Sequence, residues 1–239
     1  MELDELRRIS AKEEVSLNFI AKDEMISKAL LQLQGNEEII LKGGTAINRV
    51  YLKNKRFSED IDFDLLFKGN VKEAVIKTKE IVKKINGFDV ARPRIMKNTV
   101  RYDLFYINPL NHKDKIRLEF SVIKEAKNYS KKIVNYGFVP YESALLNVYD
   151  IEMLISHKVE CILNRIEGKD FFDLYYLMDL PIKKGNGLRL KREEILQRIT
   201  TMENQLTSVI NIINHYIPRG ERPNWNIFLE ELKEKIRKY

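Results

Sequence analysis

Apolar and polar residues follow a helical spacing near the start of the chain. Residues 11–34 place Phe19, Ile26 and Leu30 on one side and charged residues on the other, which predicts a single amphipathic helix. The apolar runs that follow are shorter. They predict a strand over residues 38–42 and helices over residues 45–52 and 71–85.

Three other segments carry apolar residues at every second position, as half-buried strands require. They cover residues 60–66, 100–106 and 116–122. In the last segment Glu119 lies on the face opposite to the apolar side chains. If this strand lies near residues 60–66, Glu119 joins the acidic residues of that strand on one face. A solvated glutamate is the alternative that the alternation leaves open.

From about residue 148 the spacing becomes wholly helical, and Asp150 is a candidate N-cap for the first helix of this region. The sequence therefore predicts an α+β protein with an N-terminal catalytic domain over residues 1–147 and a C-terminal helical bundle over residues 148–239. The predicted helices of the bundle cover residues 151–166, 170–180, 195–213 and 225–236.

Length and composition fit a globular protein with a substantial core. The chain has 239 residues and a mass of 28.3 kDa, and 44% of its residues are hydrophobic. Cys161 is the single cysteine, which excludes an intramolecular disulfide and a cysteine-based zinc cluster. The sequence has no signal-like segment and no apolar run of about 18 residues, so we expect a cytoplasmic protein without a membrane partner.

The charge balance favours a polyanionic partner such as nucleic acid. The net charge is +7 and the isoelectric point is near 9.2. A lysine-rich solvated surface would give the same values. The basic groups include Lys131 with Lys132, Lys183 with Lys184, and Arg189 with Lys191 and Arg192.

Residues 42–66 carry the clearest chemical signal. Gly43, Gly44 and Thr45 form a glycine–hydroxyl turn of the kind that lets backbone N–H groups approach a phosphate closely. An ordinary turn is the alternative interpretation of these three residues taken alone.

An acidic strand face follows the glycine turn. Asp60, Asp62 and Asp64 would point to the same side of one strand, where three carboxylates repel one another unless a divalent cation neutralises them. Mg²⁺ prefers one or two carboxylates together with waters and substrate phosphates. Asp60 and Asp62 are therefore the candidate metal pair, with Asp64 surplus or peripheral. A solvated acidic face is the alternative.

The order of these motifs resembles that of a known enzyme family. A glycine pair with a hydroxyl residue, an intervening helix and an Asp-x-Asp strand are typical of the nucleotidyltransferase fold. Residues 41–47 and 56–63 are similar to the AbiEii-type toxin nucleotidyltransferases of bacterial abortive-infection and toxin–antitoxin systems. A second match follows about a hundred residues later, at Lys158, Arg165 and the run from Lys169 to Leu177.

This resemblance implies a nucleotidyltransferase-fold domain with a mixed sheet that uses Mg²⁺ and an NTP substrate. Asp60 and Asp62 would bind two metal ions that stabilise attack on the α-phosphate, and Glu119 would act as base or third metal ligand. Lys158, assisted by Arg165, would neutralise the tail phosphates. The remaining residues to which the resemblance gives a nucleotide-binding or catalytic role are Gly43, Gly44, Thr45, Ser58, Asp170 and Asp173.

The later motif also allows a structural interpretation. Asp170 could cap a helix while Asp173 pairs with Lys169 or Arg165. The resemblance favours an active-site role for at least one of these two aspartates.

Three hypotheses about function follow. The resemblance implies transfer to an RNA such as a tRNA end by a toxin that a separately encoded antitoxin silences. A second hypothesis is an enzyme of the same fold that modifies a small hydroxylated molecule or a protein side chain. The third is a binding module that retains NTP affinity and regulates a partner without turnover. The intact pair Asp60 and Asp62 counts against the third hypothesis, because a module that only binds has little use for clustered carboxylates.

Overall fold

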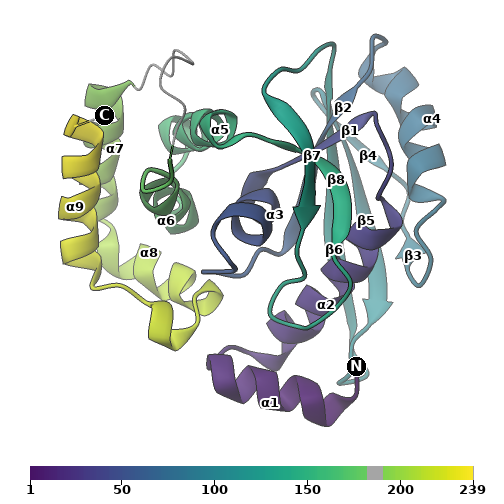
Figure 1. The fold of residues 1–239 in the computed structure, drawn as a ribbon, viewed down its shortest axis with the longest axis horizontal. Coiled ribbons are helices and arrows are strands. Elements are labelled where there is room, and N and C mark those ends of the chain that lie inside the picture. Colours follow the sequence, from purple (N-terminus) through teal and green to yellow (C-terminus); the bar gives the residue numbers. More distant parts are fainter. Residues whose placement is uncertain (182–190, 239) are drawn as a thin grey trace. The chain divides into compact units, whose positions relative to one another are not determined.

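The computed structural model describes residues 1–181 and 191–238, which form two compact units, Met1–Tyr149 and Asp150–Tyr239 (Figure 1). The predicted basic residues Lys183, Lys184 and Arg189 lie outside the described residues.

A mixed eight-stranded sheet forms the centre of the first unit (Figure 1). Its path is β3-β5-β6-β2-β1-β8-β7, with β4 paired to β5. The pairs of β2 with β6 and of β1 with β8 are parallel, and the other pairs are antiparallel. The mixed sheet predicted from the resemblance is therefore confirmed. The strands are β1 (Ile39–Lys42), β2 (Asp60–Leu66), β3 (Asp89–Val90), β4 (Arg94–Met96), β5 (Thr99–Ile107), β6 (Lys113–Ile123), β7 (Tyr129–Val134) and β8 (Ala144–Tyr149).

One face of the sheet is apolar because the strands alternate as the sequence predicts. Phe63 and Phe120 stack with their ring centroids 5.8 Å apart, and Tyr102 meets Phe120 edge to face. Helix α4 (Val71–Val82) packs on this face, where Thr78 shares a buried hydrogen bond of 2.9 Å with the Tyr102 hydroxyl. Burial of these rings leaves the opposite face of β2, β5 and β6 to polar side chains.

Two helices replace the single helix predicted over residues 11–34. They are α1 (Leu3–Glu13) and α2 (Leu17–Gln32). Glu14 has a left-handed backbone with φ of 50°, which ends α1, and the Ser16 side chain then caps α2 by accepting from the Phe19 N–H. Apolar spacing alone misses this break because apolar positions occur on both sides of it.

The regular secondary structure in the described residues of the second unit is helical. The predicted helix over 195–213 is wrong in one respect, because Gln205 leaves the helical conformation with φ of −117° and ψ of 17° and divides it in two. Strand β8 also continues to Tyr149, past the predicted boundary at residue 147. The helices are α5 (Ile151–Asn164), α6 (Gly168–Leu177), α7 (Arg192–Glu203), α8 (Leu206–Ile213) and α9 (Trp225–Lys238), with short 3₁₀ segments at Asn214–Tyr216 and Arg219–Glu221.

Aromatic side chains make up much of the core of this second unit. Phe172 of α6 stacks on Phe228 of α9 with the ring centroids 6.1 Å apart, and Trp225 meets Phe228 edge to face at 5.2 Å. Among the described helices of both units, none has the length and apolar character needed to cross a lipid bilayer.

Candidate functional site

The glycine turn joins the end of β1 to a short helix, α3 (Gly43–Ala46), which continues as a π-helix (Ile47–Tyr51). Gly43 has φ of +69°, a left-handed conformation that favours glycine. A Cβ atom at Gly43 would lie 2.4 Å from Oδ2 of Asp62. The turn and the acidic strand are therefore in direct contact, and the contact requires the absence of a side chain at Gly43.

The second glycine contacts the segment that precedes β2. A Cβ atom at Gly44 would lie 2.7 Å from Nη2 of Arg56 and 2.8 Å from Oγ of Ser58. The Thr45 hydroxyl donates to the backbone carbonyl of Asp60 at 2.5 Å. Gly44, Ser58 and Thr45, which the sequence analysis selected, thus lie together with Asp60.

Asn48 and Arg56 hold this arrangement, and sequence reasoning did not single them out. The Asn48 side chain donates to the Gly44 carbonyl at 3.0 Å and accepts from the Arg56 N–H at 3.2 Å. Arg56 is 3% exposed and donates to the Phe57 carbonyl at 2.6 Å. Asn48 lies one helical turn after Gly44 in the sequence, and this spacing could have identified it as a residue that contacts the glycine turn.

The predicted acidic residues share one face of the sheet. Asp62 on β2 lies directly opposite Glu119 on β6 and opposite Lys42 on β1. Asp60 lies directly opposite Arg117 on β6. Residues that are opposite each other on neighbouring strands point to the same side, so Glu119 joins Asp60 and Asp62 as the alternation suggested.

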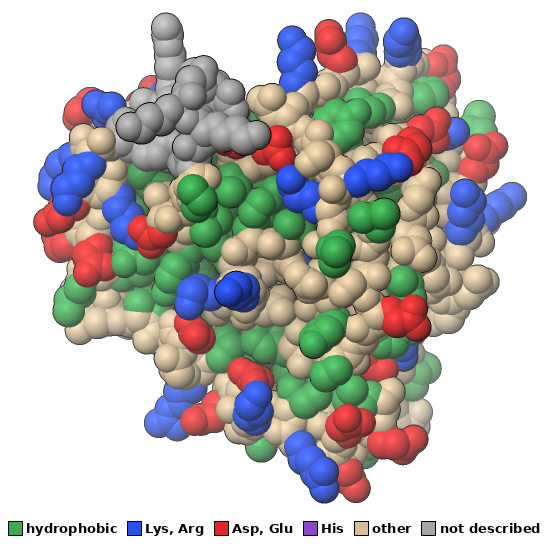
Figure 2. Space-filling model, viewed as in Figure 1, with side chains coloured by type: hydrophobic (Ala, Val, Ile, Leu, Met, Phe, Trp, Pro, Cys, Tyr) green, Lys and Arg blue, Asp and Glu red, His purple; other side chains and the backbone are tan. Residues whose placement is uncertain are grey.

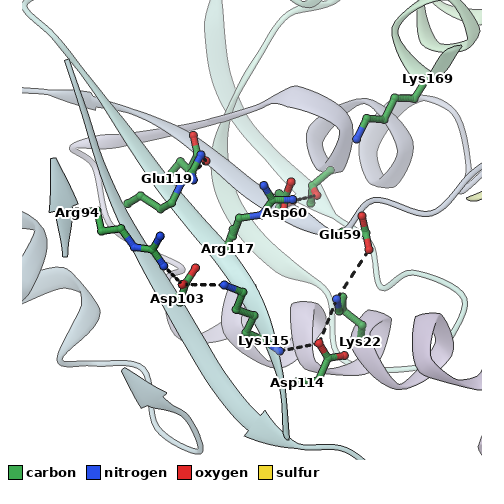
Figure 3. Close-up of polar contacts among 12 residues, drawn as sticks. Lys22, Glu59, Asp60, Arg94, Asp103, Asp114, Lys115, Arg117, Glu119 and Lys169 are labelled. Carbon is green, nitrogen blue, oxygen red and sulfur yellow. Dashed lines mark hydrogen bonds and ion pairs between the residues drawn. The ribbon is translucent and has the colours of Figure 1, made fainter. Parts of the chain in front are cut away.

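Two arginines pair with these carboxylates (Figure 3). Arg117 Nε donates to Oδ1 of Asp60 at 2.9 Å, and Arg101 contacts Oε1 of Glu119 with Nε at 2.7 Å and Nη2 at 2.6 Å. The Asp60 and Glu119 side chains are 26% and 23% exposed, so substrate-sized groups in solution can reach them. Sequence reasoning missed both arginines because their partners depend on the strand order.

Asp64 differs from the other two aspartates of β2. It is buried, and its Oδ1 pairs with the Lys42 ammonium while its Oδ2 accepts from the Tyr149 hydroxyl at 2.7 Å. Burial and the adjacent Asp64 carboxylate raise the pKa of Tyr149, so its hydroxyl stays protonated and able to donate. Asp64 is therefore occupied by internal partners, Lys42 and Tyr149.

The donor set at Asp60 and Asp62 fits Mg²⁺ that is bound together with a nucleotide. Across residues 1–181 and 191–238, no group of three or more His, Cys, Asp or Glu side chains gathers in a way that could hold a metal ion. A metal cage made of protein alone is therefore not formed by these residues. Mg²⁺ is commonly held by one or two carboxylates with substrate phosphates and waters, and two hard oxygen donors beside a phosphate-type turn match that arrangement.

The later motif forms a buried ion cluster in the second unit. Lys158 on α5 contacts Oδ1 of Asp170 at 2.8 Å and Oδ2 of Asp173 at 2.7 Å, and Arg165 Nε contacts Oδ2 of Asp170 at 2.8 Å. Asp170 and Asp173 are fully buried. Burial opposes the charge of Asp170, but Lys158 and Arg165 outweigh it and lower its pKa to about 2.

These contacts correct the structural interpretation of the later motif. Asp170 lies inside the first turn of α6 and Glu167 occupies the N-cap position, so the interpretation of Asp170 as a simple cap is wrong. Asp173 pairs with Lys158, which the structural interpretation did not consider. Lys158, Asp170 and Asp173 are buried, and the partly exposed Arg165 adds the second positive charge that balances the two carboxylates.

The fold resembles those of known nucleotidyltransferases. MenT4, a nucleotidyltransferase toxin from Mycobacterium tuberculosis H37Rv, aligns with a TM-score of 0.67 and 15% identity over 99% of this chain and 88% of that one. A putative nucleotidyltransferase from H. pylori aligns with a TM-score of 0.58 and 20% identity over 90% of this chain and 92% of that one. Comparison with curated proteins gave no match.

Family membership follows from the sequence over nearly its whole length. The family model described as nucleotidyl transferase AbiEii toxin of type IV toxin–antitoxin systems matches residues 27–238, which include the glycine turn, the acidic strand and the later motif. The resemblance inferred from those motifs is thereby confirmed. The chain belongs to the AbiEii family of nucleotidyltransferase toxins of type IV toxin–antitoxin systems.

Proposed function

We propose that this nucleotidyltransferase uses Mg²⁺ to transfer a nucleoside monophosphate from an NTP to a hydroxyl group of an RNA, such as the end of a tRNA. The observation that carries the proposal is the contact between Gly43 and Asp62. It places a turn suited to phosphate directly against a carboxylate suited to Mg²⁺, so one nucleotide–metal complex can use both.

The residues of the first unit supply distinct parts of the reaction. The backbone N–H groups of Gly43, Gly44 and Thr45, with the Ser58 hydroxyl, would bind the triphosphate. Asp60 and Asp62 would hold Mg²⁺, which supplies neutralisation of the phosphate oxygens and of the leaving pyrophosphate.

Glu119 is the proposed base. It would take the proton from the acceptor hydroxyl as that oxygen forms a bond to the α-phosphorus and the bond from the α-phosphorus to the bridging oxygen breaks. Pyrophosphate leaves with the electron pair of the broken bond. Arg101 holds Oε1 of Glu119 with two nitrogens, and this fixes the direction in which the carboxylate faces.

Contact of Lys158 and Arg165 with the tail phosphates stays a prediction from the resemblance. Lys158 already pairs with Asp170 and Asp173, so a phosphate would have to replace one of these carboxylates. Arg165, whose side chain is 48% exposed, can accept an anion at lower cost. We therefore propose that Lys158, Asp170 and Asp173 hold Arg165 and its helix in place for substrate.

An RNA acceptor is supported by the net positive charge of the chain. On the face drawn in Figure 2, the described Lys and Arg side chains are interspersed with Asp and Glu side chains. The net charge of +7 would attract a polyanion over a long range, and this attraction does not require the ion pairs on the surface to break. Membership of a type IV toxin–antitoxin family implies a cognate antitoxin. The reaction would take place in the cytoplasm, where the RNA is found.

The test is transfer of label from each of the four α-³²P-labelled NTPs to total RNA in the presence of Mg²⁺. We expect labelled RNA, lost in Asp62→Asn, and a steep decrease with salt because each neutralised phosphate releases condensed counterions. A small-molecule acceptor would show only weak salt dependence. Label found only in protein or in a small metabolite would refute the RNA acceptor, and no transfer from any NTP to any of these acceptors would refute the enzymology.

A further inference from the structure

Arg117 lies between two carboxylates on the polar face of the sheet. It is directly opposite Asp60 in the parallel pair of β6 with β2, and directly opposite Asp103 in the antiparallel pair of β6 with β5. Opposite side chains on neighbouring strands have Cβ atoms about 5 Å apart. The long Arg117 side chain can therefore reach either carboxylate without a change in the backbone.

The two carboxylates have different partners (Figure 3). Asp60 is partly exposed and accepts from Arg117 through Oδ1. Asp103 has a side chain only 2% exposed, and its Oδ2 accepts from Arg94 at 2.5 Å and from Lys115 at 2.9 Å. Its Oδ1 is buried, and no donor in the described part of the chain reaches it. Such an oxygen has lost water without gaining a hydrogen bond, so it is a strong acceptor for a nearby donor.

A divalent cation at Asp60 would change which carboxylate suits Arg117 better. The cation and the guanidinium would share one carboxylate, and their like charges repel at that distance. We propose that Arg117 is a positioning residue that exchanges partners, pairing with Asp60 before the divalent cation binds and with Oδ1 of Asp103 afterwards. This inference rests on the proposed function, because it takes Asp60 as a ligand of the cation.

The surroundings of Arg117 favour such an exchange over release into solvent. Partial burial opposes its charge, but Asp60, Glu59 and Glu119 raise the pKa of Arg117 above its ordinary value while it pairs with Asp60. An arginine side chain is not deprotonated in proteins, so the guanidinium keeps its charge after the exchange as well. Before the cation binds, Arg117 offsets the repulsion between Asp60 and its neighbour Asp62. After the exchange, the positive charge of Arg117 has moved one strand away from the cation.

Mn²⁺ binding to the full chain without NTP tests the exchange, with free Mn²⁺ measured by electron paramagnetic resonance. Removal of the competing cation in Arg117→Gln should tighten Mn²⁺ binding roughly 3- to 10-fold. Asp103→Asn should weaken binding by a similar factor, because Arg117 then loses the carboxylate opposite it on β5 as the alternative to Asp60. In the double variant the effect of Asp103→Asn should shrink to less than about twofold, since there is no arginine left to move.

A matched control keeps charge effects apart from the exchange. Lys127→Gln removes one exposed positive charge outside the strands and should leave the Mn²⁺ dissociation constant within about twofold of wild type. Asp103→Asn could also weaken Mn²⁺ binding simply because it removes a negative charge near the cation. In that case it would weaken binding equally with and without Arg117, and this result would overturn the exchange.

A second measurement uses the wild-type chain and does not depend on the folding of Asp103→Asn. The Nε–H resonance of Arg117, assigned by its loss in Arg117→Gln, should move to a new and still protected position on addition of Mg²⁺. A resonance that stays in place, or that disappears through solvent exchange, would overturn the inference. Where wild type binds Mn²⁺ only in the presence of a non-hydrolysable NTP analogue, the variants are compared with the analogue present. Absence of Mn²⁺ binding to wild type both without NTP and with the analogue would instead refute the metal site of the proposed function, and the exchange with it.

Discussion

Substitution of Gly43 by alanine tests the contact on which the proposed site depends. An L-residue in the left-handed region costs about 1–2 kcal/mol, and Gly43 has φ of +69°. The new Cβ would lie 2.4 Å from Asp62 Oδ2, whereas ordinary contact begins at 3.4 Å, so the carboxylate must move by about 1 Å. A displacement of that size at a reacting centre costs about 10²-fold in rate. We expect this loss in transfer of α-labelled nucleotide at saturating NTP.

Gly87→Ala is the matched control for this substitution. Gly87 has φ of +84°, and a Cβ there would meet no atom within 4 Å, so it carries the backbone cost without the contact with Asp62. Both variants should lose about 1–2 kcal/mol of stability in thermal unfolding followed by circular dichroism. Only Gly43→Ala should lose transfer activity. Full activity in Gly43→Ala, or an equal loss in Gly87→Ala, would refute the reasoning.

Three further predictions concern the acidic strand and the buried cluster. Asp60→Ala or Asp62→Ala should abolish transfer while leaving the melting temperature unchanged or higher, and an active Asp60→Ala would contradict the metal assignment. Lys158→Met should lower the free energy of unfolding by about 3–5 kcal/mol because it removes the cation that contacts both buried carboxylates and leaves Asp170 with Arg165 alone, whereas the half-buried Lys169→Met should cost under about 1 kcal/mol. The pKa of Asp170 is about 2, below its ordinary value of 3.8, so its share of stability is present above pH 4 and is lost as the pH falls towards 2. Thermal unfolding across that pH range checks the last prediction, and a melting temperature that stays constant there would contradict it.

The sequence predicts strands β1, β2, β5 and β6, but it misses strands β3, β4, β7 and β8 and the interruptions of the helices. Alternation in β2 and β6 follows from the two-residue repeat of a half-buried strand, and it is a property of each residue and its neighbours. The breaks at Glu14 and Gln205 depend on single backbone conformations that leave the apolar spacing almost unchanged. A periodic pattern therefore joins α1 to α2 and α7 to α8.

The candidate site also has features that the sequence predicts and features that it does not. The shared face of Asp60 and Asp62 could be predicted from their spacing, and Glu119 could be added only on the condition that its strand lay nearby. The register of β6 beside β2 meets that condition. The pairs that Asp60 and Glu119 form with Arg117 and Arg101 could not be predicted, because they require the register of β5 with β6 and the pairing of β6 with β2, which is distant in the chain.

The roles of two buried charged residues, Asp64 and Lys158, could not be predicted for the same reason. Asp64 looks equivalent to Asp60 in the sequence, but Lys42 and Tyr149 surround it in the folded sheet. Lys158 looks like a cation in need of a phosphate, but α6 brings two carboxylates to it. In both cases a partner from a distant segment decides what the charge does.

Comparison of α-³²P-labelled with γ-³²P-labelled NTP tests the central claim most directly. The account predicts that the α-label becomes attached to RNA in a Mg²⁺-dependent reaction and that the γ-label leaves as pyrophosphate. The Asp62→Asn variant should give neither labelled RNA nor labelled pyrophosphate. Retention of the γ-label on the acceptor would mean phosphoryl transfer, and would contradict nucleotidyl transfer at the Gly43–Asp62 site.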